Sequence, residues 1–150
     1  MSSPFMPGRA RAAAVAFRIL GIAVIGLGVL HLYATVLIRD YVLARISDAS
    51  LRGFISPGYL LNHILVGVLL LPMGLLMVWS SRALGAGERW AYFLNLVFSL
   101  TLLTFPVLII AVMAGPEFRS AAFGTASVLA VLVALGSCGV LLWARRDLRG

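Results

Sequence analysis

Two histidines are the residues of this sequence whose type and position could best perform chemistry. His31 and His63 are the only histidines, and each lies in a long apolar stretch. Neutral imidazoles from two facing helices can ligate the iron of a b-type haem, or begin a copper or zinc site that a third ligand completes. Alternatively, each ring bonds a backbone carbonyl or a neighbour such as Asn62 or Tyr33 and specifies helix contacts. We favour this second interpretation and expect no cofactor, with haem b as the alternative.

Other chemical constellations are not present in the sequence. The single Cys138 excludes an intrachain disulfide and a CxxC redox pair. Residues 136–139 do not form a G-x-S-x-G elbow, and no acidic residue lies within the long apolar stretches. We therefore expect no catalytic residue and no dedicated metal site.

Asn95 and Ser99, one helical turn apart, form a small polar stripe. We expect this stripe to hydrogen-bond across a helix bundle, and the alternative is that it lines a substrate cavity.

Composition identifies the environment in which these residues must work. Hydrophobic residues make up 62% of the 150 residues and charged residues only 11%, which a soluble domain could not bury. The net charge of +7 comes from arginines that lie between apolar stretches. A nucleic-acid-binding protein would instead gather its basic residues on one polar surface, so we exclude that class and take the bilayer as the partner.

Four stretches without charged residues are long enough to cross a bilayer: residues 19–38, 59–79, 90–113 and 121–143. As helices they would be roughly 30 to 36 Å long, against a hydrocarbon core of about 30 Å. The sequence thus predicts an all-α integral membrane protein, a four-transmembrane-helix bundle forming one domain over residues 1–150, with a short flexible N-terminus at residues 1–11.

The arginines predict the orientation of the bundle. One side would carry eight of them (Arg9, Arg11, Arg18, Arg82, Arg89, Arg145, Arg146 and Arg149) and the other side four (Arg39, Arg45, Arg52 and Arg119). The richer side is expected to face the cytoplasm, which puts both termini inside. Trp79, Trp90 and Trp143 fall at this same side, at the depth where indole rings prefer the headgroup boundary. This plan resembles that of many small multi-pass proteins of the bacterial inner membrane.

Residues 39–58 form the longest connection in this scheme, and their pattern is amphipathic. Arg45, Asp48 and Arg52 share one helical face. We expect a short helix lying on the outer membrane interface, ended by Gly53 and by a turn at residues 56–58. The link at residues 80–89 is short, so the second and third spans should form a tight antiparallel hairpin.

Small residues predict where the helices approach closely. The fourth span carries a stripe of alanines at intervals of four, consisting of Ala122, Ala126, Ala130 and Ala134. Such a stripe allows close packing, either within the chain or in a homo-oligomer. Gly21, Gly26 and Gly28 could act similarly in the first span. Pro72 and Pro106 each remove a backbone donor, and kinks are expected there.

Three functions follow from these patterns. A non-enzymatic accessory or interaction subunit of a membrane complex needs only a stable bundle and packing surfaces. A haem-binding or quinone-linked redox protein would use His31 and His63. An oligomeric channel or carrier for a small solute would use the prolines and Asn95. We favour the first because it requires the fewest assumptions.

Overall fold

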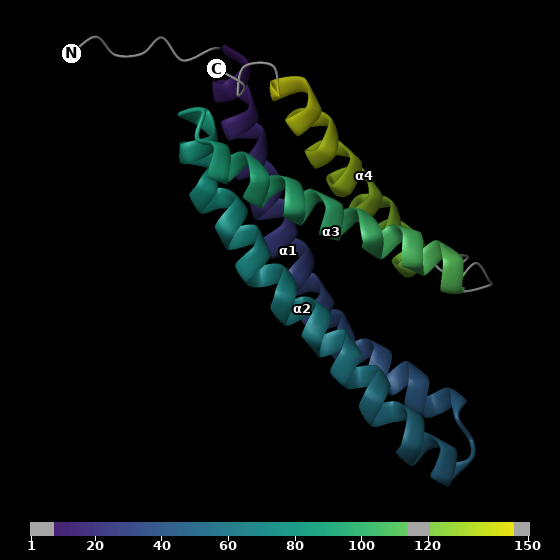
Figure 1. The fold of residues 1–150 in the computed structure, drawn as a ribbon. Helices are drawn as coiled ribbons and strands as arrows, with labels where there is room; N and C mark the ends of the chain where they lie inside the picture. Colours follow the sequence, from purple (N-terminus) through teal and green to yellow (C-terminus); the bar gives the residue numbers. More distant parts are fainter. Residues whose placement is uncertain (1–7, 114–120, 146–150) are drawn as a thin grey trace. The chain divides into compact units, whose positions relative to one another are not determined.

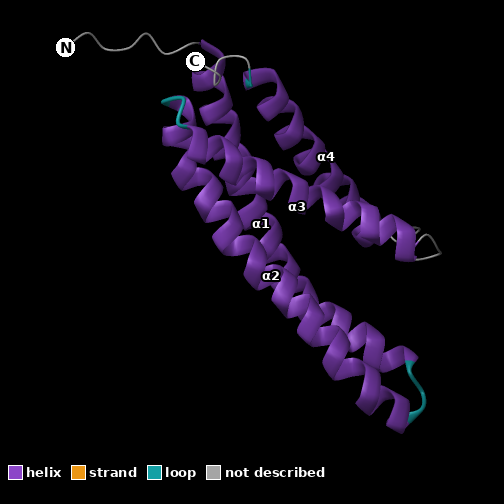
Figure 2. Cartoon of the chain, in the orientation of Figure 1, coloured by secondary structure: helices purple, strands orange, loops and turns teal. Residues whose placement is uncertain are grey.

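The computed structural model describes residues 8–113 and 121–145. In these ranges the chain forms four α-helices and no strand: α1 (Gly8–Arg45), α2 (Ala49–Gly85), α3 (Arg89–Met113) and α4 (Ala121–Ala144) (Figure 1, Figure 2). The protein is therefore all-helical in its described part. Among these residues, two helices are long and apolar enough to cross a membrane, namely α1 and α2.

The helices divide into two compact units. Unit 1 comprises Met1–Gly21 and Leu76–Gly150, and unit 2 comprises Ile22–Leu75. Unit 2 is thus an antiparallel hairpin made from residues 22–45 of α1 and residues 49–75 of α2. Unit 1 combines the start of α1 and the end of α2 with the whole of α3 and α4.

The predicted interfacial helix over residues 39–58 is wrong. Instead, α1 continues to Arg45 and α2 begins at Ala49, so only three residues connect the two helices. Asp48 caps α2: its Oδ1 accepts hydrogen bonds from the backbone N–H groups of Ser50 and Leu51 at 2.8 and 3.0 Å and from the Ser50 hydroxyl at 2.6 Å. The Arg52 side chain donates to the carbonyl of Ile46 at 2.9 and 2.6 Å. Together these hydrogen bonds close a tight turn between α1 and α2.

The expected helix break at Gly53 and the turn at residues 56–58 are also wrong, because α2 runs through both. Pro57 lies inside the helix and leaves the carbonyl of Gly53 without its helical donor. Gly53 is exposed and lies outside the long apolar stretch, where solvent can take the place of the missing donor. Pro72 and Pro106 likewise lie within continuous helices.

At the other end, α1 begins at Gly8, so residues 8–11 are helical rather than flexible. Residues 1–7 lie outside the described part.

The link between α2 and α3 is short, as predicted, but it consists of residues 86–88 rather than 80–89, because α2 continues to Gly85. Gly87 has φ of 80°, a left-handed conformation that glycine adopts without a steric penalty. The N–H of Gly87 donates to the carbonyl of Leu84 and that of Glu88 to the carbonyl of Ala83, both at 3.0 Å. This is the Schellman arrangement, which ends a helix and turns the chain.

Within unit 1, α3 and α4 pack against each other. Side chains from all four helices are buried there: Ala10, Ala13, Phe17, Met77, Leu84, Ala91, Leu102, Val133, Ala134, Leu141 and Ala144. Of the predicted alanine stripe, Ala134 is fully buried and Ala130 half-buried. Ala122 and Ala126 lie in α4, but their side chains are outside the described ones.

Candidate functional site

Two glycines set the distance between α1 and α2 in unit 2. A Cβ atom added to Gly28 would lie 3.0 Å from the carbonyl oxygen of Gly67 and 3.1 Å from the Cβ of Leu70. A Cβ atom on Gly67 would lie 2.7 Å from the Leu32 side chain and 3.2 Å from the carbonyl oxygen of Gly28. The two backbones therefore touch at this point, as small residues allow in membrane helices. Gly26 takes no part in this contact, because a Cβ there would meet open space.

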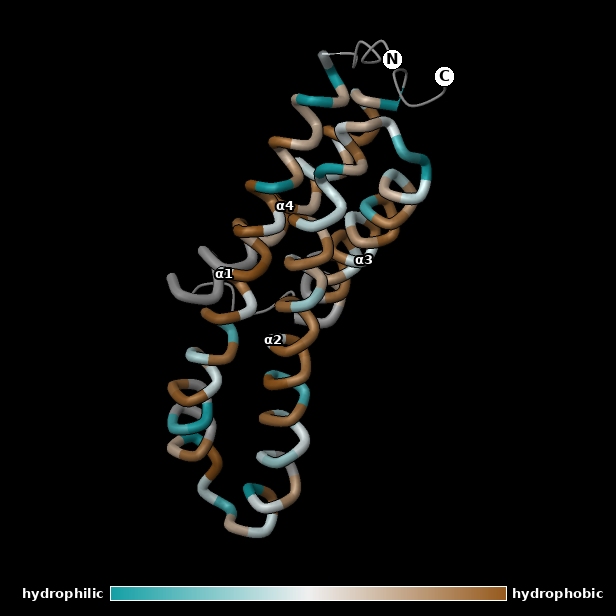
Figure 3. Tube along the Cα trace, turned by 90° about the vertical axis from the view of Figure 1, so that its left-hand side faces the viewer, coloured by the Kyte–Doolittle hydropathy of each residue, from teal (hydrophilic) through white to brown (hydrophobic). Residues whose placement is uncertain are grey.

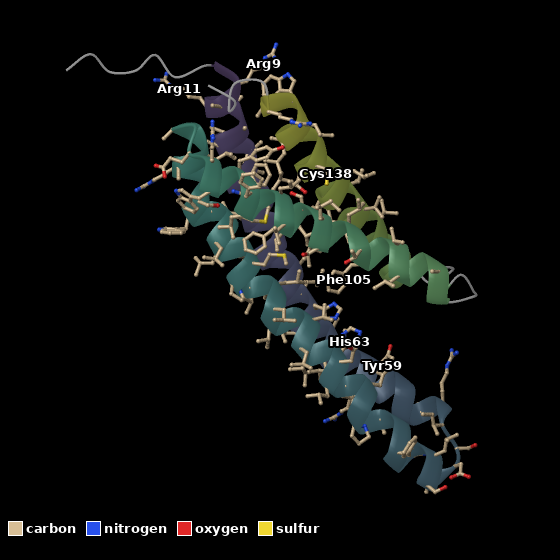
Figure 4. The ribbon with its side chains drawn as sticks, viewed as in Figure 1. Arg9, Arg11, Tyr59, His63, Phe105 and Cys138 are labelled. Carbon is tan, nitrogen blue, oxygen red and sulfur yellow. The ribbon has the colours of Figure 1, made fainter. Side chains whose placement is uncertain are left out.

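The glycine contact brings the two histidines together. One turn further toward the connection, His31 follows Gly28 on α1, and His63 precedes Gly67 on the antiparallel α2. Their rings stack with centroids 4.0 Å apart and planes inclined by 17°. Tyr59, a turn along α2, lies with its ring centroid 5.7 Å from that of His63 (Figure 4). The paired position expected from the sequence is thus observed, as a face-to-face stack.

The surroundings of the pair differ from those expected. Asn62 and Tyr33, the neighbours suggested as hydrogen-bond partners, are exposed. Thr35 is buried and donates to the backbone carbonyl of His31 at 2.9 Å. The Nδ1 atom of His63 is buried and has no hydrogen-bond partner among the residues that the structure describes. Both rings are half-buried, so the pair is held by ring stacking and helix packing.

The stacked geometry does not fit a shared metal ion or a haem iron. An imidazole nitrogen binds a metal in the plane of its ring, at about 2.0–2.1 Å for zinc. The planes of His31 and His63 are nearly parallel, so no single ion lies in both planes at that distance. A haem held by two imidazoles needs them on opposite faces of the iron. At least one ring would have to turn before the pair could ligate a metal.

A second polar cluster lies in unit 1. Asn95 of α3 is fully buried and donates through Nδ2 to the Ser80 hydroxyl of α2 at 2.9 Å and to the carbonyl of Ala91 at 2.7 Å. Ser99, also fully buried, donates to the carbonyl of Asn95 at 2.7 Å. Asn95 thus links two helices, while the Ser99 hydroxyl bonds within its own helix. The Oδ1 of Asn95 has no partner among the described residues.

Sequence reasoning missed two residues of these sites. Gly67 was not singled out. It follows His63 by four residues, about one helical turn, just as Gly28 precedes His31 by three residues on the antiparallel helix. Ser80 was assigned to a link, whereas it lies in α2 and is fully buried. Both lie on the side of α2 that is buried at every third or fourth position from Gly67 to Leu84, a pattern that the structure shows and that the apolar sequence of α2 does not mark.

The end of the α1–α2 hairpin is a third candidate. We call residues 39–58 the hairpin tip. Phe54 is 85% exposed and Leu51 49% exposed, while Arg39 and Asp40 form an exposed ion pair at 3.1 Å. The hydroxyl of Ser50, followed by the backbone N–H groups of Leu51 and Ser50, lowers the pKa of Asp48 below its usual value. The tip therefore combines an ordered turn with exposed apolar side chains.

The chain matches no protein-family model, and neither the curated proteins nor the solved structures include a significant match to it. Over residues 8–113 and 121–145 the fold is all-helical, and two of the helices described there are long and apolar enough to cross a membrane.

Proposed function

We propose that the chain is a small inner-membrane protein that crosses the bilayer four times, with both termini in the cytoplasm, and acts as a non-enzymatic accessory or interaction subunit of a membrane complex. Four spans are supported by the lengths of α3 and α4, which have 25 and 24 residues. At 1.5 Å per residue they reach about 36 Å or more, enough for a core of about 30 Å. The arginine excess at the termini supports the orientation.

The hairpin tip is the observation that carries the interaction role. With 38 and 37 residues, α1 and α2 are each about 55 Å long, far more than the hydrocarbon core requires. In Figure 3 hydrophilic segments alternate with hydrophobic ones at the tip, as suits a segment at the edge of the core. A helical hairpin that leaves the bilayer and carries a phenylalanine in the open is suited to contact another protein.

Site-specific crosslinking tests this role. A photoreactive phenylalanine analogue would replace Phe54 in the tip or, as a control, Phe93, which is 60% exposed on α3. Irradiation of cells should crosslink the Phe54 variant to one defined protein, and the Phe93 variant mainly to lipid. Crosslinks from Phe54 to lipid alone would contradict the proposal, and crosslinks to a second copy of the chain would indicate a homo-oligomer instead.

The topology has a separate test. Ala49 and Ala86 are both exposed, the first in the tip and the second in the α2–α3 turn. Single cysteines at these positions, in a Cys138→Ser background, would be treated with a membrane-impermeant maleimide. Ala49→Cys should react in intact cells, and Ala86→Cys only after permeabilisation. The reverse labelling pattern would show that the chain has the opposite orientation in the membrane.

The redox alternative depends on His31 and His63, whose rings would have to leave their stack. Its test is the absorption spectrum of the purified protein, oxidised and reduced. A Soret band that disappears in both His31→Ala and His63→Ala would replace the interaction role with haem binding. The channel alternative depends on Asn95, and solute flux into proteoliposomes that is lost in Asn95→Leu would support it.

A further inference from the structure

Arginines and tryptophans gather at one end of unit 1. The start of α1 and the end of α2 meet there, because a Cβ atom on Gly85 would lie 3.0 Å from that of Ala14. Arg9 of α1 lies over the Trp143 ring of α4, with its guanidinium carbon 5.7 Å from the ring centroid. Trp79 of α2 and Trp90 of α3 have ring centroids 5.4 Å apart. Ends of all four helices therefore share one surface.

We call this surface the Arg–Trp face. Its described members are Arg9, Arg11, Arg18, Arg82, Arg89, Arg145, Trp79, Trp90 and Trp143, all of them exposed. Arg9 and Arg11 extend from the start of α1 in Figure 4. Together these residues supply every tryptophan of the chain and six of its twelve arginines.

Among the described residues, little negative charge accompanies the positive charge of this face. Within the described part of unit 1, Glu88 is the acidic residue of the face, and its carboxylate accepts a hydrogen bond from the Trp90 indole nitrogen. Six guanidinium groups thus face one carboxylate that already has a partner. Unit 2 differs, since Arg39 there is paired with Asp40.

We propose that the Arg–Trp face binds the headgroups of anionic phospholipids. Exposed indoles prefer the depth of the lipid headgroups, and 65% of Trp79, 43% of Trp90 and 50% of Trp143 is exposed. Guanidinium groups at this depth can donate paired hydrogen bonds to phosphate oxygens, and their stems can lie along apolar surface. Anionic lipid also supplies negative charge to the exposed arginines of this face. A soluble anion would use the arginines but would leave the indoles without a role.

The tryptophans make the test direct, because tryptophan fluorescence, excited selectively over that of the four tyrosines, reports on this face alone. The full chain would be reconstituted in phosphatidylcholine vesicles that contain brominated phosphatidylglycerol or, in a parallel series, brominated phosphatidylcholine with the same acyl chains. Bromine quenches nearby indoles, so the two series compare headgroups at equal acyl chemistry. Phosphatidylglycerol should bind about two- to fivefold more strongly at the face, as expected for arginines near a charged surface.

Two matched double variants locate the effect. Arg82→Gln/Arg89→Gln removes two exposed charges from the face, and Arg39→Gln/Arg45→Gln removes two from the hairpin tip. The first should reduce the preference for phosphatidylglycerol toward unity, and the second should leave it unchanged. Unaltered helical circular dichroism would show that both variants are folded. Equal loss of preference in the two variants would mean that net charge acts without a specific surface, which would overturn the proposal.

Two further outcomes would also overturn it. Equal quenching by both lipids in the unmodified protein would show that the headgroup is not recognised. Inorganic phosphate that abolishes the preference, where chloride of equal ionic strength does not, would identify a site for a soluble anion instead. The inference rests on the proposed membrane insertion but not on the interaction role of the hairpin tip, because the crosslinking and the lipid experiments use different residues and can fail separately.

Discussion

The two units accommodate polar side chains between helices in different ways. In unit 1, Asn95 donates across to Ser80 of the neighbouring helix and to its own helix, and both residues are fully buried. In unit 2, His31 and His63 meet by ring stacking over a backbone contact between glycines, and the His63 Nδ1 has no partner among the described residues.

This difference separates two uses of polar residues between packed helices. A hydrogen bond across helices fixes their rotation and depth, since few geometries satisfy it. A stack of half-buried imidazoles restricts the rotation and depth of the helices less, and it leaves hydrogen-bonding groups of the rings unused. Buried polar atoms that lack partners are rare in proteins, and each cluster has one among the described residues, the Nδ1 of His63 and the Oδ1 of Asn95, so both clusters are places for a role other than packing.

The largest effect is expected from a substitution that breaks the contact between Gly28 and Gly67 next to the histidine pair. Gly28→Val should cost about 1–3 kcal/mol of unfolding free energy, because the new side chain would overlap the Gly67 backbone and Leu70. Unfolding would be followed by circular dichroism during titration of micelles with dodecyl sulfate. Gly26→Val is the matched control and should change the value by less than about 0.5 kcal/mol, since that position faces open space. Similar costs at both positions would indicate that valine itself disturbs α1.

The next largest effect concerns the hydrogen bond between Asn95 and Ser80 in unit 1. A double-mutant cycle of Ser80→Ala and Asn95→Ala should give a coupling energy of about 0.6 kcal/mol and at most about 1.7, the range measured between membrane helices. The same titration supplies the four stabilities. Asn62→Ala removes an exposed asparagine from α2 and should have almost no effect. A coupling of zero would mean that the bond does not help to hold α2 and α3 together.

A smaller effect is expected at the histidine stack. His63→Phe keeps an aromatic ring beside His31 and removes the unpartnered nitrogen, so its stability should equal or exceed that of the unmodified protein. His63→Ala should lose about 0.5 kcal/mol of ring interaction in addition to the smaller buried area. Destabilisation by His63→Phe comparable to that by His63→Ala would show that the imidazole nitrogens make a structural contact.

The helical class and the positions of the apolar stretches were predictable from sequence, because membrane-length helices leave a strong composition signal. The ends of α1 and α2 were not. The pattern of Arg45, Asp48 and Arg52 suits a surface helix and a capped turn equally well. Only tertiary geometry shows Arg52 donating to the carbonyl of Ile46. Gly53 and Pro57 predicted a break in the helix. Both are exposed near the start of α2, where the helix tolerates them.

The candidate site was predictable in its residues and not in its geometry. His31 and His63 lie at similar distances from the turn of an antiparallel hairpin and therefore face each other. Their spacing along the chain could indicate this. Whether the rings stack or point toward a common ion depends on the distance between the helices. That distance is set by Gly28 and Gly67 on separate segments, and a single sequence does not show that they face each other.

The smallest effect concerns the turn that joins the two helices of unit 2, and it depends on pH. Hydrogen bonds from Ser50 and Leu51 lower the pKa of Asp48 in the folded protein. A lowered folded-state pKa means that the stabilisation is present above the unfolded-state value, near 4, and is lost as the pH falls through the folded value. Hydrogen-exchange protection of the Ser50 and Leu51 amides should therefore decrease below about pH 4. In Asp48→Asn, which keeps a capping oxygen without the charge, this pH dependence should vanish, whereas Asp40→Asn should retain it. Persistence of the acid-induced loss in Asp48→Asn would assign it to another group and would remove Asp48 as the residue that orders the tip.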